Sequence, residues 1–117
     1  MSHSGQMRFI SRMGQTTEFC YVGESIQLQI VEAELDGTAF TTATSTTAAV
    51  TKEDGTSISS GTFTYTATLP GFDSDTPGWY LNTVAPTTPG RIHGHGTLVN
   101  TGATGKWHCS IDVRNLT

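Results

Sequence analysis

Residues 25–31 read SIQLQIV, and polar and apolar side chains alternate from Ser25 to Ile30. Ile26, Leu28 and Ile30 fall on one face and the glutamines between them on the other, which is the period of a β-strand with one face toward a core. The turn dipeptide Asp36-Gly37 follows the run. The stretch therefore predicts a strand at Ser25–Val31.

The same alternation returns along the chain, between turn signals. Further strands are expected at Thr44–Thr51, Thr62–Leu69, Arg91–Asn100 and Lys106–Arg114. Residues 52–56 contain Asp54-Gly55 and predict a hairpin loop, and residues 101–105 are expected to join the last two strands. About seven strands with turns every 8 to 12 residues are typical of an immunoglobulin-like antiparallel β-sandwich.

Composition supports an all-β domain. The chain has 117 residues, of which 35% are hydrophobic and 14% charged, and threonine and glycine take many of the remaining places. Threonine is β-branched and suits a pleated surface with one polar face. A chain of this length forms one domain that buries roughly two-thirds of the surface its unfolded form exposes.

The first residues show no regular spacing of apolar side chains. We therefore interpret residues 1–20 as an extended N-terminal arm ahead of a domain at 21–117. The first thirteen residues contain two arginines and no acid, so a basic arm precedes an acidic body. Such an arm combines apolar burial with pairing to acidic partner surfaces. The expected partner-contact residues are Met7, Arg8, Phe9, Ile10, Arg12 and Met13.

Charge and hydropathy exclude several partners. The formal net charge of −4 argues against a nucleic-acid surface. No apolar stretch approaches the ~20 residues of a membrane span, and the start lacks the apolar core of a signal peptide, so we expect a soluble protein made in the cytoplasm. Cys20 and Cys109 are interpreted as buried thiols, with a bridge as the alternative.

Two groups of residues suggest metal binding. His93 and His95 share a strand face, and His108, Cys109 and Asp112 could add ligands from the next strand. Acid-rich segments at 32–36 and 73–75 offer oxygens for calcium. No metal-binding motif accompanies either group, so we interpret them as surface histidines and solvated acids and expect no metal or cofactor.

Catalytic motifs are missing from the sequence. It contains no Gly-x-Ser-x-Gly elbow and no phosphate-binding glycine loop, so we expect a protein that is not an enzyme. Phe72, Trp79, Tyr80 and Trp107 could form an aromatic platform for sugar rings. A carbohydrate-binding or adhesion module is therefore the alternative function.

Several turn motifs together resemble those of a known family. The motifs are Gly23-Glu24-Ser25, Asp36-Gly37, residues 50–56 (VTKEDGT), Trp79-Tyr80, residues 86–91 (PTTPGR) and Gly105-Lys106-Trp107. Their order is similar to the layout Gly-Asp-Thr, Asp-Gly, Lys-Pro-Asp-Gly-Thr of immunoglobulin-like structural domains of tailed bacteriophages. Glu53 stands where that layout has proline. Gly105-x-Trp107-x-Cys109 also resembles the Gly-x-Tyr-x-Cys strand of immunoglobulin domains. In this chain, however, Cys20 precedes the Ser25 strand instead of lying within it, so only the sandwich architecture is implied.

The resemblance implies a structural virion protein that joins, closes or decorates a phage particle at its head, neck or tail. Its expected partners are capsid, portal or tail subunits and further copies of itself, and its expected location is the virion, assembled in the host cytoplasm. Neither nucleic acid nor membrane is an expected partner.

Overall fold

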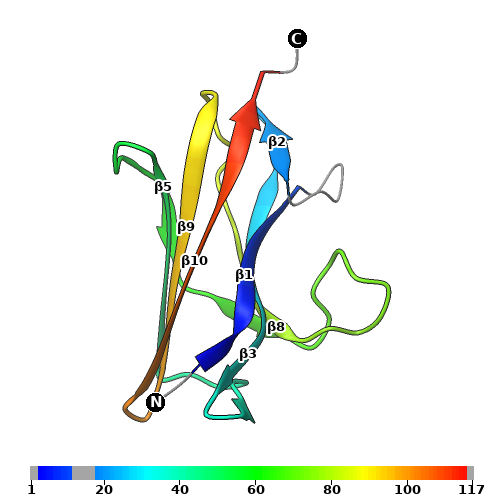
Figure 1. Ribbon diagram of the computed structural model, residues 1–117, viewed down its shortest axis with the longest axis vertical. Coiled ribbons are helices and arrows are strands. Elements are labelled where there is room, and N and C mark those ends of the chain that lie inside the picture. Colours follow the sequence, from blue (N-terminus) through cyan, green and yellow to red (C-terminus); the bar gives the residue numbers. More distant parts are fainter. Residues whose placement is uncertain (1–2, 12–17, 116–117) are drawn as a thin grey trace.

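Two β-sheets pack against each other in the computed structural model, which describes residues 3–11 and 18–115 (Figure 1). The strands are β1 (His3–Ser11), β2 (Phe19–Tyr21), β3 (Ile26–Leu35), β4 (Thr38–Ala39), β5 (Ser45–Lys52), β6 (Ser57–Gly61), β7 (Thr64–Thr66), β8 (Gly78–Asn82), β9 (Gly90–Asn100) and β10 (Ala103–Arg114). These residues contain no helix, and hence no helical segment that could span a membrane. The expected all-β class is confirmed.

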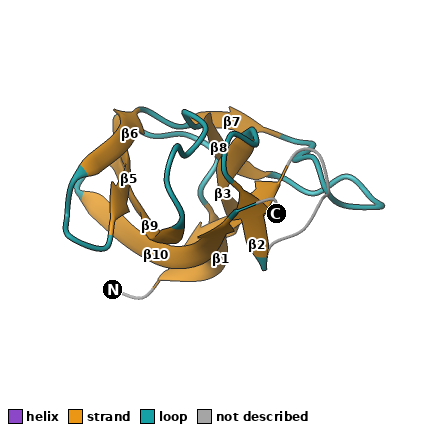
Figure 2. Cartoon of the chain, turned by 90° about the horizontal axis from the view of Figure 1, so that it is seen from above, coloured by secondary structure: helices purple, strands orange, loops and turns teal. Residues whose placement is uncertain are grey.

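The strands divide into two sheets that Figure 2 shows from above. Sheet A has the order β1-β3-β8-β7, with β4 also paired to β3, and sheet B has the order β2-β10-β9-β5-β6. Neighbouring strands are antiparallel except β2 and β10, which are parallel. The chain therefore passes from the edge of sheet A, through β1, to the edge of sheet B, through β2.

The core lies between the sheets and is built from the alternating residues that the sequence analysis singled out. Ile26, Leu28 and Ile30 of β3 are at most 1% exposed, as predicted. From sheet B the core receives Val50, Ile92, Leu98, Trp107, Ile111 and Val113. The alternation expected for residues 106–114 is confirmed. Trp107, Ile111 and Val113 are buried, whereas His108 and Arg114 are exposed.

The first segment differs from its prediction. Residues 3–11 form β1, which pairs antiparallel with β3 from His3 opposite Leu35 to Ser11 opposite Ile26. The interpretation of these residues as an arm outside the domain is therefore wrong. The prediction failed because the partner strand is distant along the chain. A short stretch of sequence does not show which strand it will pair with.

The outer face of sheet A is also less exposed to solvent than the sequence predicts. Gln27 and Gln29 are 4% and 0% exposed, although their alternation places them on the face away from the core. Residues 67–77, which connect β7 to β8, cover this face, and Nε2 of Gln29 donates a hydrogen bond of 3.1 Å to the carbonyl of Pro70. The connection projects beside β8 in Figure 1.

The strand expected at Thr62–Leu69 is shorter in the structure. Only Thr64–Thr66 is a strand, and a turn follows in which the amide of Thr68 donates to Oγ1 of Thr66 at 3.2 Å. Phe63 is buried in the core, whereas Ala67 is exposed. The alternation therefore continued beyond the residues that have a neighbouring strand.

The connections expected at residues 52–56 and 101–105 are both present, and the second is shorter than expected. Residues 52–56 connect β5 to β6, with the amide of Lys52 donating to the carbonyl of Thr56 at 2.8 Å. β9 and β10 are joined by Thr101 and Gly102 alone, whose φ values of 50° and 83° suit a tight two-residue turn. This turn fixes which residues of the two strands lie opposite each other.

Candidate functional site

Three histidines lie together on the outer face of sheet B. His95 of β9 is directly opposite His108 of β10, and His93 precedes it by two residues on the same face. The ring centroids of His95 and His108 are 5.0 Å apart, and those of His93 and His108 are 5.4 Å apart. We call His93, His95 and His108 the histidine cluster.

Neighbouring strands supply polar partners to the histidine cluster. Nε2 of His93 lies 2.8 Å from Oε1 of Glu53, which belongs to the hairpin after β5. Nε2 of His95 lies 3.3 Å from Oγ1 of Thr51. Sequence analysis did not associate Glu53 with the histidines; the hairpin predicted at 52–56 was the only signal of its position.

Charge repulsion acts within the histidine cluster. Partial burial, and then the nearby His108 and His93, lower the pKa of His95 below its ordinary value. The lowered pKa favours the neutral imidazole of His95, which has a lone pair on one ring nitrogen. Within the residues described, no three His, Cys, Asp or Glu side chains are placed to hold a metal ion as they stand.

A hollow borders the histidine cluster. It has a volume of about 360 Å³ and is lined by His95, Gly96, Thr97, Lys106, Trp107 and His108. Lys106 is exposed and stands opposite Thr97 on the same outer face. The cluster is therefore open to solvent and to a partner rather than enclosed.

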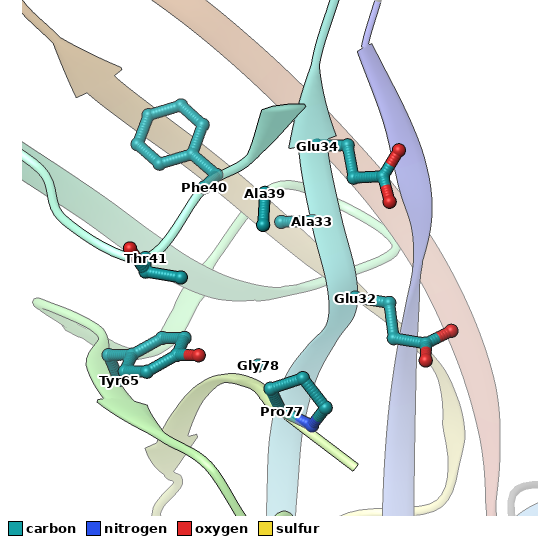
Figure 3. A pocket seen from close by; sticks show the side chains of 9 residues that line it. All are labelled: Glu32, Ala33, Glu34, Ala39, Phe40, Thr41, Tyr65, Pro77 and Gly78. Atoms are coloured by element: carbon teal, nitrogen blue, oxygen red, sulfur yellow. The ribbon is translucent and has the colours of Figure 1, made fainter. Parts of the chain in front are cut away.

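A second hollow of about 190 Å³ lies in sheet A, where β3, β4 and β8 meet (Figure 3). Phe40 and Tyr65 stand on one side of β3, and the carboxylates of Glu32 and Glu34 point away on the other side. Because the acidic groups face away from the aromatic rings, this hollow does not present a cation site between them.

Backbone strain occurs beside this second hollow. Glu32 has a φ of 51°, which is unusual for a residue with a side chain, and its amide donates to the carbonyl of Pro77 at 3.1 Å. The register of β1 and β3 shifts here, between Ser4 and Gln6. Gly5 fits the resulting bulge because a Cβ atom would meet the backbone at Val31 and Ala33.

The predicted partner-contact residues do not form one exposed surface. Met7 and Phe9 are 6% and 1% exposed and belong to the core between the sheets. Ile10 is 2% exposed on the opposite face, where a Cβ atom at Gly71 would collide with it. These three apolar side chains are therefore occupied within the chain, which corrects the prediction that they contact a partner.

The remaining predicted contacts have different outcomes. Arg8 is partly buried and lies with its guanidinium carbon 4.2 Å from the ring centroid of Phe72. Arg12 and Met13 lie outside the described residues. Arg8 therefore joins β1 to the connection at 67–77 rather than extending from the domain.

The two cysteines are free thiols, of which Cys20 is buried, as the favoured interpretation had both, and Cys109 is partly buried. Burial raises the pKa of Cys109 to about 12. Burial, and then the charge of Glu24, raise the pKa of Cys20 to about 11. Neither thiol has the lowered pKa that a nucleophilic cysteine needs.

The tryptophans do not assemble the aromatic platform that the alternative function requires. Trp79 is 5% exposed, and its indole nitrogen donates a hydrogen bond of 2.7 Å to the carbonyl of Phe40. Trp107 is 8% exposed. Phe72 is exposed, but Arg8 already lies over its ring.

Comparison with known proteins adds no assignment. No protein-family model matches the sequence, and neither a curated protein nor a solved structure shows significant similarity to the chain.

Proposed function

We propose that the chain is a non-enzymatic structural protein of a tailed bacteriophage particle, in which an immunoglobulin-like β-sandwich contacts neighbouring subunits. The observation that carries the proposal is the strand order of the two sheets. Immunoglobulin-like sandwiches place strands A, B, E and D in one sheet and G, F and C in the other, with C′ added in the variable type.

Every described strand except the two-residue β4 can be assigned to a strand of that order. β1-β3-β8-β7 corresponds to A-B-E-D, and β10-β9-β5-β6 corresponds to G-F-C-C′. β2 then corresponds to the second half of the first strand, which leaves sheet A and pairs in parallel with β10. This assignment supports the immunoglobulin-like architecture that the turn motifs resemble.

Two of the motifs that carry the resemblance lie in turns of the structure. Asp36 and Gly37 have φ values of 51° and 81° in the turn after β3, and residues 52–56 form the hairpin after β5. Both motifs therefore lie in turns between consecutive strands of this chain, which supports the resemblance to phage domains. Fold does not by itself define function, and the virion role rests on that resemblance.

The proposal moves the subunit contacts away from β1. Because Met7, Phe9 and Ile10 are buried, the contacts fall on exposed loops and outer sheet faces, including the projecting connection at 67–77. The capsid, portal or tail proteins, and further copies of the chain, are the proposed partners. The alternative of a sugar-binding module is less well supported because Trp79 and Trp107 are buried.

The test is to find the chain in particles. Phage particles from cells expressing the gene are purified on a density gradient and analysed by mass spectrometry, and electron microscopy then locates the chain. A fixed copy number per particle supports the proposal. Absence from intact particles overturns it, and glycan binding by the monomer in an array would favour the alternative.

A further inference from the structure

The histidine cluster has the strand arrangement that a three-histidine metal site requires. Two of its members alternate on β9, and the third comes from β10 directly opposite one of them. Side chains directly opposite on antiparallel strands have Cβ atoms roughly 5 Å apart, close enough to share one ligand. The two-residue turn at Thr101 and Gly102 holds this register.

The ring separations also agree with coordination. With zinc–nitrogen bonds of about 2.0–2.1 Å and tetrahedral angles, two imidazole centroids on one ion lie roughly 5 Å apart. The separations from His108 are 5.0 Å to His95 and 5.4 Å to His93. As they stand, the three side chains are not placed to hold an ion, and the rings of His93 and His108 are stacked at an interplanar angle of 23°. Binding needs the rings of His95 and His108 to rotate about χ2, which is soft for histidine, while His93 keeps its contact with Glu53.

Glu53, in the hairpin after β5, lies against the histidine cluster. Histidines that bind metals commonly engage a carboxylate through their other ring nitrogen, which fixes the ring and increases its basicity. Oε1 of Glu53 contacts one ring nitrogen of His93 at 2.8 Å, and the second ring nitrogen is the one that would face an ion. Glu53 is therefore placed as an orienting residue.

We propose that His93, His95 and His108 bind a zinc ion on the outer face of sheet B, with Glu53 orienting His93. Imidazole nitrogens suit zinc and other late first-row dications, whereas calcium and magnesium prefer oxygen. The adjoining hollow of about 360 Å³ leaves the fourth coordination position to water or to a ligand from another molecule. The site is independent of the proposed virion role.

The test measures zinc binding by the full chain after treatment with a chelator. A competition titration against a chromogenic zinc indicator is expected to give one ion per chain. His95→Ala and His108→Ala are each expected to weaken binding at least tenfold, and Glu53→Gln about tenfold. Circular dichroism and thermal unfolding establish that each variant is folded.

His3 provides a matched control within the same chain. It is exposed on β1 and packs its ring against Trp107, with centroids 5.0 Å apart, but is not a member of the histidine cluster. His3→Ala is expected to bind zinc as the unmodified chain does. The proposal is overturned if no stoichiometric zinc is bound, or if His3→Ala loses as much affinity as His108→Ala.

Discussion

Nε of Arg8 donates a hydrogen bond of 2.7 Å to Oε1 of Gln29, a side chain that is fully buried on the outer face of sheet A. The amide of Gln29 in turn donates to Oε1 of Gln27 at 2.8 Å and to the carbonyl of Pro70. A charged residue of β1 thus satisfies a polar network beneath the connection at 67–77. Such networks stabilise a fold only when every member has a partner.

Replacing Arg8 should therefore destabilise the domain. Arg8→Ala leaves the buried carbonyl oxygen of Gln29 without this donor, and we expect a loss of about 1–3 kcal/mol in the free energy of unfolding. Arg114 is the matched control, because it also lies 4.2 Å over an aromatic ring, that of Phe19, but is exposed. Arg114→Ala should cost below about 1 kcal/mol. Urea unfolding measures both, and equal losses would contradict the role given to Gln29.

Glycine at position 71 is required for a second reason besides its φ of 97°. An added Cβ atom would collide with Ile10 and approach Arg8 at 2.8 Å. Gly55 also has a positive φ, of 89°, yet a Cβ atom there would meet nothing within 4 Å. We expect Gly55→Ala to cost about 1 kcal/mol of strain and Gly71→Ala at least about 1 kcal/mol more. Thermal unfolding that ranks the two variants in the reverse order would show that residues 67–77 do not pack on β1.

The two tryptophans should respond differently to the same substitution. Trp79 donates to the carbonyl of Phe40, whereas Nε1 of the buried Trp107 has no hydrogen-bond partner among the described residues. Trp79→Phe should therefore cost about 1–3 kcal/mol more than Trp107→Phe, because only the former leaves a carbonyl unpaired. Chemical unfolding followed by far-ultraviolet circular dichroism measures the difference. A greater loss in Trp107→Phe would mean that this indole nitrogen has a partner after all.

Alkaline pH should weaken the fold through Cys109. Its pKa is about 12 in the folded chain against an ordinary value of 9.0, so between these values the unfolded chain binds fewer protons. The free energy of unfolding therefore falls as pH rises from about 9 toward 11. Cys109→Ala should show a shallower fall in urea titrations, with Cys20, whose pKa is about 11, still contributing. An unchanged slope would exclude Cys109 as a source of the pH dependence.

The strand predictions were correct where the segment of alternating apolar and polar residues pairs with a neighbouring strand in the structure. Ile26 to Ile30 and the residues from Trp107 to Val113 were placed correctly because both runs pack on the core between the sheets. The glutamines of β3 were expected on a polar face and are buried, since alternation does not reveal a loop that folds back over a sheet. β1 was missed because its partner lies beyond a turn and another strand.

The histidine cluster could be predicted only in part. The alternation of His93 and His95 was visible, but the place of His108 depends on the register of β9 and β10. The turn was expected to span residues 101–105, and the structure closes it with Thr101 and Gly102 alone. Counting outward from that dipeptide pairs His95 with His108, so the turn length was the missing information.

The parallel pairing of β2 with β10 has a mechanical meaning. β1 begins at one end of the long axis of the molecule and β10 finishes at the other (Figure 1). Tension applied between these ends would pull β2 and β10 in opposite directions along their length. Their hydrogen bonds, at Phe19 to Tyr21 against Asp112 to Arg114, would then be loaded together in shear instead of opening one at a time. A chain connected in this way is suited to resist tension applied between its two ends.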